Sequence, residues 1–224
     1  MRVFLFNFLN FIIMGIYTPT SVSRETRNSI GYETYCKSRG IHVVKAKITT
    51  NTSKTKEQQR VRAAWPEYLR LATLFAEAAL LGFPQRKREL TAYNAFVQAN
   101  KGVVSVDDEL QATVDYEQVV CSEGSLKVPD VTVALDAEQR TLTFTHEAEE
   151  SGVLRDAEDS VQAFVVNGAR DDAKLYALGT RADSEPVPVT LPSKWDTEGL
   201  AVYVFVLSPD KRKASGTVYL TPQA

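Results

Sequence analysis

Six cationic side chains offer the clearest chemistry in this sequence. Three lie in a long helical stretch and three follow it: Arg60, Arg62, Arg70, Arg86, Lys87 and Arg88. Side chains of this kind neutralise phosphates, and nucleic-acid binding through them would weaken steeply with salt. The same spacing also fits the solvated face of an amphipathic helix and a polar loop. We interpret the six residues first as solvated surface, and second as a contact surface for a protein or nucleic-acid partner.

The sequence gives little support to catalysis. His42 is expected in a strand, with no His, Asp or Glu partner at metal spacing. His146 stands beside Glu147, but no pattern places a nucleophile or an orienting group near it. The P-loop, the dinucleotide fingerprint and the hydrolase and zinc-protease signatures are all missing from the sequence. We therefore expect a non-enzymatic protein with no cofactor and no metal site.

Acidic residues gather in the expected loops of the second half of the chain. They are Glu147, Glu149, Glu150, Asp156, Glu158, Asp159, Asp171 and Asp172. Calcium binds such groups, but the Asp-x-Asp-x-Asp-Gly register of a calcium loop does not occur. We interpret the cluster as a solvated acidic rim.

Two cysteines, Cys36 and Cys121, lie far apart in the sequence. A bridge between them requires an oxidising compartment, whereas isolated cysteines are more often small buried apolar residues. Both alternatives stay open from the sequence.

Charge divides the chain into two parts. Through Lys101 there are 16 Lys+Arg against 6 Asp+Glu, a net charge of +10, and from Gly102 onward 10 against 22, a net charge of −12. The split predicts two modules. The basic part is either a footprint for an anionic partner or a surface that attracts the acidic part, within one chain or between chains.

The first residues are strongly apolar but too few to span a bilayer. The run from Met1 to Tyr17 falls short of the ~20 residues that a membrane helix needs, so we expect no integral span. Three alternatives stay open for residues 1–28: an upstream extension before a true start at Met14, a secretory signal ending near Ser23, or a structural segment. The first implies a cytoplasmic or particle-associated protein, and the second an exported one.

The basic module is predicted as a hairpin and a helix. Residues 29–48 alternate apolar and polar side chains around a turn ending at Gly40. From Thr55, which fits a capping box with Gln58, an apolar stripe at helical spacing continues to Gly82. Pro66 predicts a kink or break near Trp65, and we expect a stop at Gly82 in the C′ position and a shorter helix from about Thr91 to Asn100.

From Leu110 the apolar period changes to two, which indicates strands. We predict eight: 113–120, 128–135, 141–145, 161–166, 173–178, 187–191, 201–207 and 215–220. Short strands separated by Gly, Pro, Asp and Ser are typical of a β-sandwich, and a fibronectin-III-like relative is the form we favour. Strand 201–207 is apolar at every position, so we place it centrally in its sheet.

The order of several short motifs resembles a known family. The front part contributes residues 31–45, the helix from Thr55 with Arg62, and 94–100; the back part contributes 159–167, Trp195 with 202–205, and 208–220. Together they resemble the Bacteroidota proteins grouped as domain of unknown function 6266, from about Met14 to the C-terminus. The resemblance implies an architecture and no activity.

These observations predict an α+β fold in three parts. They are a leader or extension over residues 1–28, a hairpin plus amphipathic-helix module over 29–102, and an Ig/fibronectin-III-like antiparallel β-sandwich over 110–224. The function we predict is interaction or assembly with protein, either self or other, at a cell surface or in a mobile-element particle. Nucleic-acid binding by the basic module is the alternative.

Overall fold

The chain forms two compact units. A computed structural model describes residues 14–18, 28–38, 40–47 and 54–223. The first unit is Met1–Lys54, and the second, called the body here, is Thr55–Ala224. The boundary expected between residues 102 and 110 lies inside the body, because the helices before it share a hydrophobic core with the strands after it.

The first unit contains a four-stranded antiparallel sheet, called the N-terminal sheet here. Its strand order is β1-β4-β3-β2. The strands are β1 Met14–Ile16, β2 Asn28–Ile30, β3 Glu33–Ser38 and β4 Ile41–Ala46. The hairpin predicted over 29–48 contains β3 and β4, and Gly40 takes the positive φ of 82° that the turn between them requires. Its first strand was predicted as continuous, but a turn at Gly31 and Tyr32 divides it into β2 and β3. Residues 1–13 and 19–27, most of the expected leader, lie outside the described residues.

The long helical stretch is divided, but not at its proline. Helix α1 spans Lys56–Leu74 with Pro66 inside it, and α2 spans Ala76–Gly82. The interruption lies at Phe75, whose fully buried ring packs on three aromatic neighbours. The predicted start is confirmed, since Thr55 Oγ1 accepts a hydrogen bond from the backbone N–H of Gln58 at 3.3 Å.

Gly82 ends α2 in a way the sequence did not predict. It is the last helical residue, and its φ is not in the left-handed region expected of a C′ glycine. A Cβ at this position would stand 2.2 Å from the Cys121 carbonyl oxygen. The glycine is therefore required for close backbone approach. The next helix, α3 Ala92–Ala99, lies within the predicted stretch 91–100, and the Thr91 hydroxyl caps it.

A small hairpin and one 3₁₀ turn follow the helices. Strands β5 Val104–Val106 and β6 Ala112–Val114 pair antiparallel. The strand predicted over 113–120 is wrong beyond Val114, where the chain forms the 3₁₀ helix η1, Tyr116–Gln118. The Asp115 carboxylate accepts the Glu117 amide at 3.1 Å, and the buried Tyr203 hydroxyl donates to the Tyr116 carbonyl at 2.6 Å. These side-chain bonds replace strand pairing here.

The remaining strands form two antiparallel sheets, in order β10-β9-β12-β13 and β11-β8-β7. Their bounds are β7 Val131–Asp136, β8 Thr141–His146, β9 Ser160–Asn167, β10 Asp172–Thr180, β11 Val187–Thr190, β12 Leu200–Leu207 and β13 Val218–Leu220. Each overlaps a stretch that the period-two pattern predicts as strand, and β7, β8, β9, β10 and β12 extend one or two residues beyond it. The fold is therefore mixed α+β with a β-rich body.

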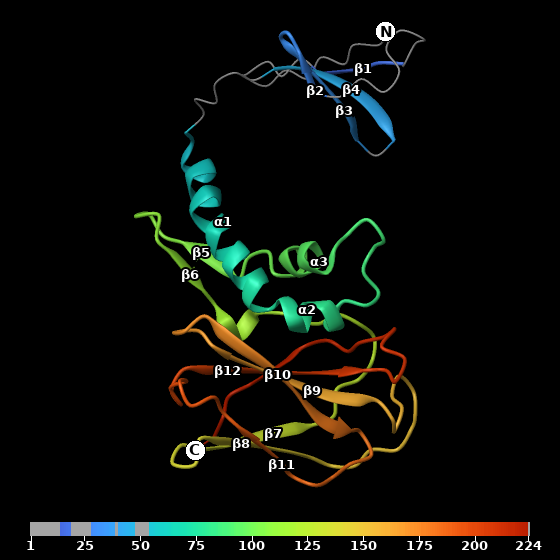
Figure 1. Cartoon of the computed structure of the whole chain (residues 1–224), viewed down its shortest axis with the longest axis vertical. Helices are drawn as coiled ribbons and strands as arrows, with labels where there is room; N and C mark the ends of the chain where they lie inside the picture. Colours follow the sequence, from blue (N-terminus) through green and yellow to red (C-terminus); the bar gives the residue numbers. More distant parts are fainter. Residues whose placement is uncertain (1–13, 19–27, 39, 48–53, 224) are drawn as a thin grey trace. The chain divides into compact units, whose positions relative to one another are not determined.

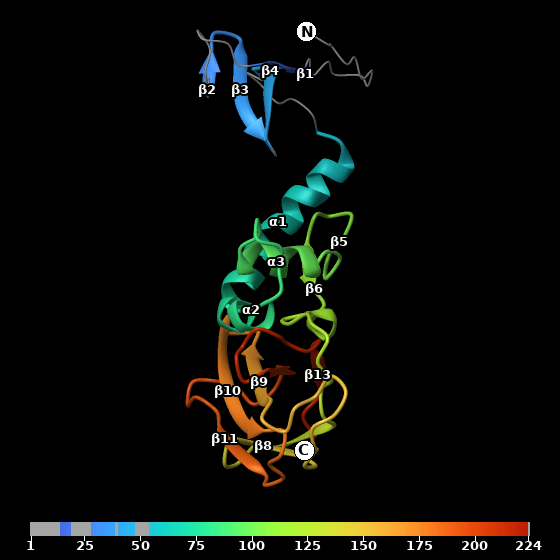
Figure 2. The ribbon, with the colours of Figure 1, turned by 90° about the vertical axis from the view of Figure 1, so that its right-hand side faces the viewer.

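The four-stranded sheet is covered on both faces. Figures 1 and 2 show α1, α2 and α3 on one side of it and the three-stranded sheet on the other. One core joins Phe75 and Phe96 to Phe164, Tyr203 and Phe205; a second core fills the space between the two sheets. Every residue of β12 is buried as a result, which confirms its predicted central place.

Gly82→Ala is expected to lower the free energy of unfolding by about 2–3 kcal/mol, because the new methyl group overpacks against backbone that cannot move aside. Urea denaturation measures the loss. Gly216→Ala is the matched control, since a Cβ there meets nothing within 4 Å. Equal effects of the two substitutions would contradict the close-approach explanation.

Candidate interaction surfaces

The two half-buried arginines of the predicted contact set on α1 are engaged within the chain. Arg60 pairs with Asp108 at 2.7 Å and with Glu57 at 3.3 Å. Arg70 pairs with Glu67 at 2.7 Å and with Asp171 of the β9–β10 turn. Burial opposes the charge of Arg70, but hydrogen bonds to Glu67, Tyr116 and Asp171 raise the pKa of its guanidinium above the ordinary value. Both arginines thus tie α1 to later parts of the body.

The other predicted residues lie on the surface of the body. Arg62 is exposed on α1, and Lys87 and Arg88 are exposed in the loop after α2. Arg86 donates to the Phe83 carbonyl at 2.8 Å and to the Leu90 carbonyl at 3.2 Å, which holds this loop closed. Of the six cations, only Arg86 and Lys87 line the cavity of about 630 Å³ between this loop and α3. A nucleic-acid contact through the six residues stays a prediction.

The N-terminal sheet presents several exposed apolar side chains. None of its residues whose side chains are described is buried. Ile16, Ile30, Tyr32 and Ile41 are between 48% and 86% exposed. A single-layer sheet in water requires a covered hydrophobic face for independent stability. This sheet therefore lacks, within the described residues, the burial that would stabilise it.

Register assigns the apolar side chains of the N-terminal sheet to its two faces. Ile16 and Cys36 both lie opposite Val43, and Ile41 is two residues from Val43 on β4, so these four share one aliphatic face. The other face carries aromatic residues. The Tyr17 ring lies 5.4 Å from the rings of Tyr35 and His42. A hydrogen bond to the Glu33 carboxylate raises the pKa of the Tyr35 hydroxyl.

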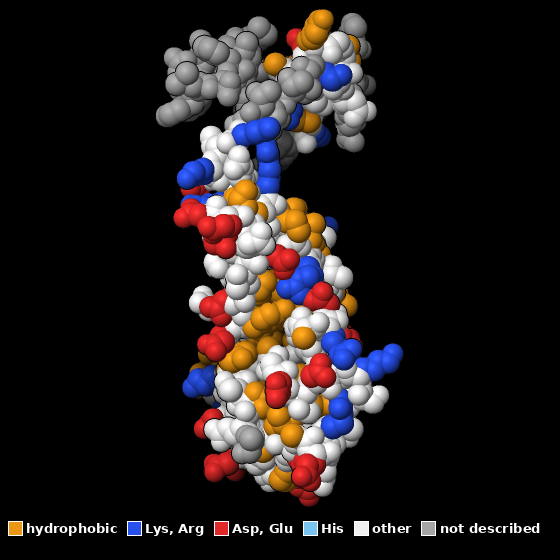
Figure 3. Space-filling view, turned by 90° about the vertical axis from the view of Figure 1, so that its left-hand side faces the viewer, with side chains coloured by type: hydrophobic (Ala, Val, Ile, Leu, Met, Phe, Trp, Pro, Cys, Tyr) orange, Lys and Arg blue, Asp and Glu red, His pale blue; other side chains and the backbone are white. Residues whose placement is uncertain are grey.

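A second exposed apolar surface follows α1 in the body. Val61, Trp65 and Leu69 recur every four residues and are 64%, 51% and 38% exposed. Leu69 also lines a groove of about 480 Å³ between α1 and the start of β10, together with Arg70, Thr73, Leu74, Asp171, Asp172 and Ala173. Figure 3 shows apolar side chains gathered in the middle of the body, with charged side chains beside them.

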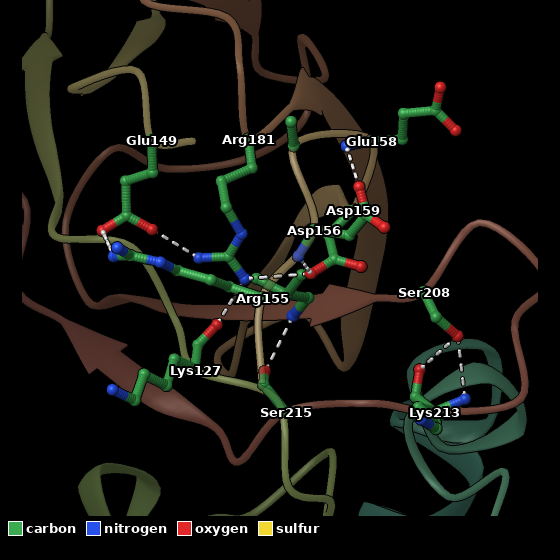
Figure 4. Close-up of polar contacts among 12 residues, drawn as sticks. Lys127, Glu149, Arg155, Asp156, Glu158, Asp159, Arg181, Ser208, Lys213 and Ser215 are labelled. Carbon is green, nitrogen blue, oxygen red and sulfur yellow. Dashed lines mark hydrogen bonds and ion pairs between the residues drawn. The ribbon is translucent and has the colours of Figure 1, made fainter. Parts of the chain in front are cut away.

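The expected acidic rim includes a buried ion-pair network, shown in Figure 4. The fully buried Arg181 donates to Glu149 Oε2 at 2.6 Å, to the Lys127 carbonyl at 2.6 Å and to Asp159 Oδ2 at 3.3 Å. Asp159, which is 1% exposed, also accepts the Asp156 amide at 2.8 Å. Interpreting Asp159 as solvated was wrong, because sequence spacing gave no sign of its distant arginine partner.

The two histidines lie in different units. His42 is in the N-terminal sheet, and His146 is a buried residue at the end of β8. Nδ1 of His146 lies 3.2 Å from the Glu147 carbonyl oxygen, and both residues line a cavity of about 670 Å³. In the described part of the chain, no group of three or more His, Cys, Asp or Glu side chains has metal-binding geometry.

Comparison with known proteins decides the family. The chain matches the family of unknown function DUF6266 over residues 26–221. It belongs to that family. The match spans the N-terminal sheet from β2 onward and nearly all of the body, so both units are part of the DUF6266 architecture. No curated protein matches the chain, and no solved structure matches it.

Both cysteines of this DUF6266 protein are free. Cys36 is half-buried in the N-terminal sheet, whereas Cys121 is fully buried in the body. Burial raises the pKa of the Cys121 thiol to about 12, although a hydrogen bond from Thr217 acts in the opposite direction.

None of the helices in the described residues is both long and apolar enough for a bilayer span.

Arg181→Met is expected to lower the free energy of unfolding by about 3–5 kcal/mol, because it leaves the buried Asp159 carboxylate without its cation. Arg155→Met is the control. Its ion pair with Glu149 is longer, at 3.8 Å, and partly exposed, so we expect a loss of at most about 1 kcal/mol. Urea denaturation compares the two variants, and similar losses would contradict a special role for the buried network.

Cys121 makes stability depend on alkaline pH. The pKa of the Cys121 thiol in the folded chain, about 12, exceeds the ordinary value of 9.0. Its stabilising contribution to the free energy of unfolding is therefore complete below about pH 9 and is lost as pH rises toward 12. At pH 10 the loss is about 1.4 kcal/mol relative to neutral pH. Denaturation at both pH values should show this part of the loss in the native chain but not in Cys121→Ala. An identical pH dependence of the two chains would refute the prediction.

Proposed function

We propose that this protein is a non-enzymatic assembly protein that binds a protein partner through the aliphatic face of its N-terminal sheet. One observation carries the proposal: no residue of that sheet with a described side chain is buried, although Ile16, Ile41 and Val43 share a face. Burial of exposed apolar side chains that share one face is the ordinary driving force of protein association. The sheet gains its missing burial from the partner.

Charge defines the partner's chemistry. The first unit carries 8 Lys+Arg against 2 Asp+Glu, a net charge of +6. Lys45 and Lys47 are exposed at the end of β4. A complementary partner presents apolar side chains bordered by carboxylates, because like charges at the rim of an interface oppose encounter. Salt should therefore slow association, while the apolar contact determines the lifetime of the complex.

The body supplies the scaffold in this proposal. Its two larger sheets place β7, β8 and β11 opposite β9, β10, β12 and β13, and we propose a fibronectin-III-like sandwich on the strength of that order. It differs from the constant-type immunoglobulin order in one strand, since β10 lies at the edge of the other sheet. Such sandwiches serve many unrelated functions, so the fold supports the scaffold role and not a particular partner.

Ile16→Lys combined with Ile41→Lys tests the proposal in the full chain. We expect light scattering to show concentration-dependent association of the native chain, weakened at least roughly tenfold by the double variant. The control is Val153→Lys, which adds a lysine at an exposed apolar position of the body. A chain that stays monomeric while its β3 and β4 amides resist hydrogen exchange would refute the proposal, since the sheet would then be stable alone.

A further inference from the structure

His146 interrupts the apolar side of β8. Leu142, Phe144 and His146 are buried and alternate with residues that are more exposed, so the imidazole takes the third inward position of the strand. The first two positions are apolar, whereas His146 is polar and only 5% exposed. A buried polar side chain requires hydrogen-bond partners for its polar atoms, so each ring nitrogen of His146 needs one.

One of the two ring nitrogens of His146 has no partner among the described residues. Nδ1 lies 3.2 Å from the Glu147 carbonyl oxygen. Because a carbonyl oxygen only accepts, Nδ1 carries the proton and Nε2 is an acceptor. Nε2 is not sealed in the core, since the buried side-chain atoms without partners in the described part of the chain both belong to arginines. It is therefore open to the cavity of about 670 Å³ that the ring lines.

Two carboxylates and two hydroxyls line the same cavity. They belong to Asp130, Glu147, Thr145 and Ser184, all of which are exposed. Within the described residues, none of these four side chains makes a hydrogen bond or an ion pair. The cavity therefore offers an imidazole nitrogen, hydroxyl oxygens and two negative charges, and no lysine or arginine of the described residues lines it.

Two other carboxylates near the cavity are already engaged. Glu149 lines it, but its oxygens pair with Arg181 at 2.6 Å and with Arg155 at 3.8 Å (Figure 4). Asp183 accepts the backbone N–H of Thr180 at 2.6 Å and the hydroxyl of the same residue at 3.0 Å. The negative charge available to a ligand is therefore that of the two unpaired carboxylates.

We propose that this cavity binds a primary ammonium group carried on an alkyl chain. An ammonium has three donors and no acceptor, which matches a wall made of acceptors. Its donors turn toward separate acceptor atoms, whereas a guanidinium requires two acceptors in one plane. A metal ion fits less well, because no three His, Cys, Asp or Glu side chains of the described residues have metal-binding geometry. The cavity volume also lies in the range of pockets that hold organic ligands.

The bound ammonium completes the hydrogen bonding of His146. Donation to Nε2 gives the buried ring the hydrogen bond that it lacks, and the carboxylates of Asp130 and Glu147 balance the charge. A lysine side chain of a protein and a free alkyl diamine both present this group. The site lies wholly in the body, so it adds to the proposed function and does not depend on the N-terminal sheet.

Titration of the full chain with n-butylammonium tests the site, with sodium keeping the ionic strength constant. The NMR signals of the His146 ring should shift as the ligand binds. Glu147→Gln removes one of the two free charges and should weaken binding at least roughly fivefold. Glu150→Gln is the matched control: it removes the same charge from an exposed residue of the same loop that does not line the cavity, and should change binding less than about twofold. His146→Phe keeps a ring but removes the acceptor, and should weaken binding several-fold.

Equal losses in Glu147→Gln and Glu150→Gln would overturn the site, because they would reduce the binding to general attraction by the acidic loops. A titration that leaves the His146 signals unchanged would overturn it as well. N-acetyl-lysine amide and diaminobutane distinguish the two sources: tighter binding of the first assigns the ammonium to a protein lysine, tighter binding of the second to a free diamine, and either result supports the site. Binding should persist in the Ile16→Lys, Ile41→Lys chain, so this site and the proposed function fail separately.

Discussion

The structure of the body depends on burying one sheet from both sides. Strands β9 and β12 carry apolar residues on both faces, so the four-stranded sheet is stable only with a layer on each. Phe75 joins the helical layer to it: the ring lies 5.1 Å from Phe164, 5.2 Å from Tyr203 and 5.3 Å from Phe96. The break between α1 and α2 at Phe75 is explained by this contact, since the chain turns where this fully buried ring enters the core.

The N-terminal sheet shows the opposite condition. Its strands are well paired, yet none of its described side chains is buried, and strand pairing alone contributes little net stability in water. The contrast between the two units is the physical basis for assigning assembly to the first and scaffolding to the second. The polar groups of the body support that division. Arg60 and Arg70 bind carboxylates of the body, and Arg181 holds the acidic loops.

Local patterns predicted the elements well where one local cause was sufficient. The Thr55 hydroxyl caps α1, and the short apolar stretches predicted as strands overlap β7 to β12, because capping and pleating involve only near neighbours. The errors have the opposite origin. Residues 115–120 looked like a strand, but the Asp115 cap and the distant Tyr203 hydroxyl stabilise a 3₁₀ turn instead. Gly82 was predicted as a C′ residue, but glycine is required there because the Cys121 carbonyl oxygen lies too close for a Cβ.

By itself, then, the sequence determined the α+β class, the basic and acidic division, the central place of β12 and the resemblance that the DUF6266 match confirms. The tertiary structure alone decided which side chains meet. It placed the helices on the sheet, paired Arg181 with Asp159, and left the described side chains of the N-terminal sheet unburied. The reason is range: periodicity and capping act over a few residues, whereas ion pairs, covered faces and free edges depend on residues far apart in the chain.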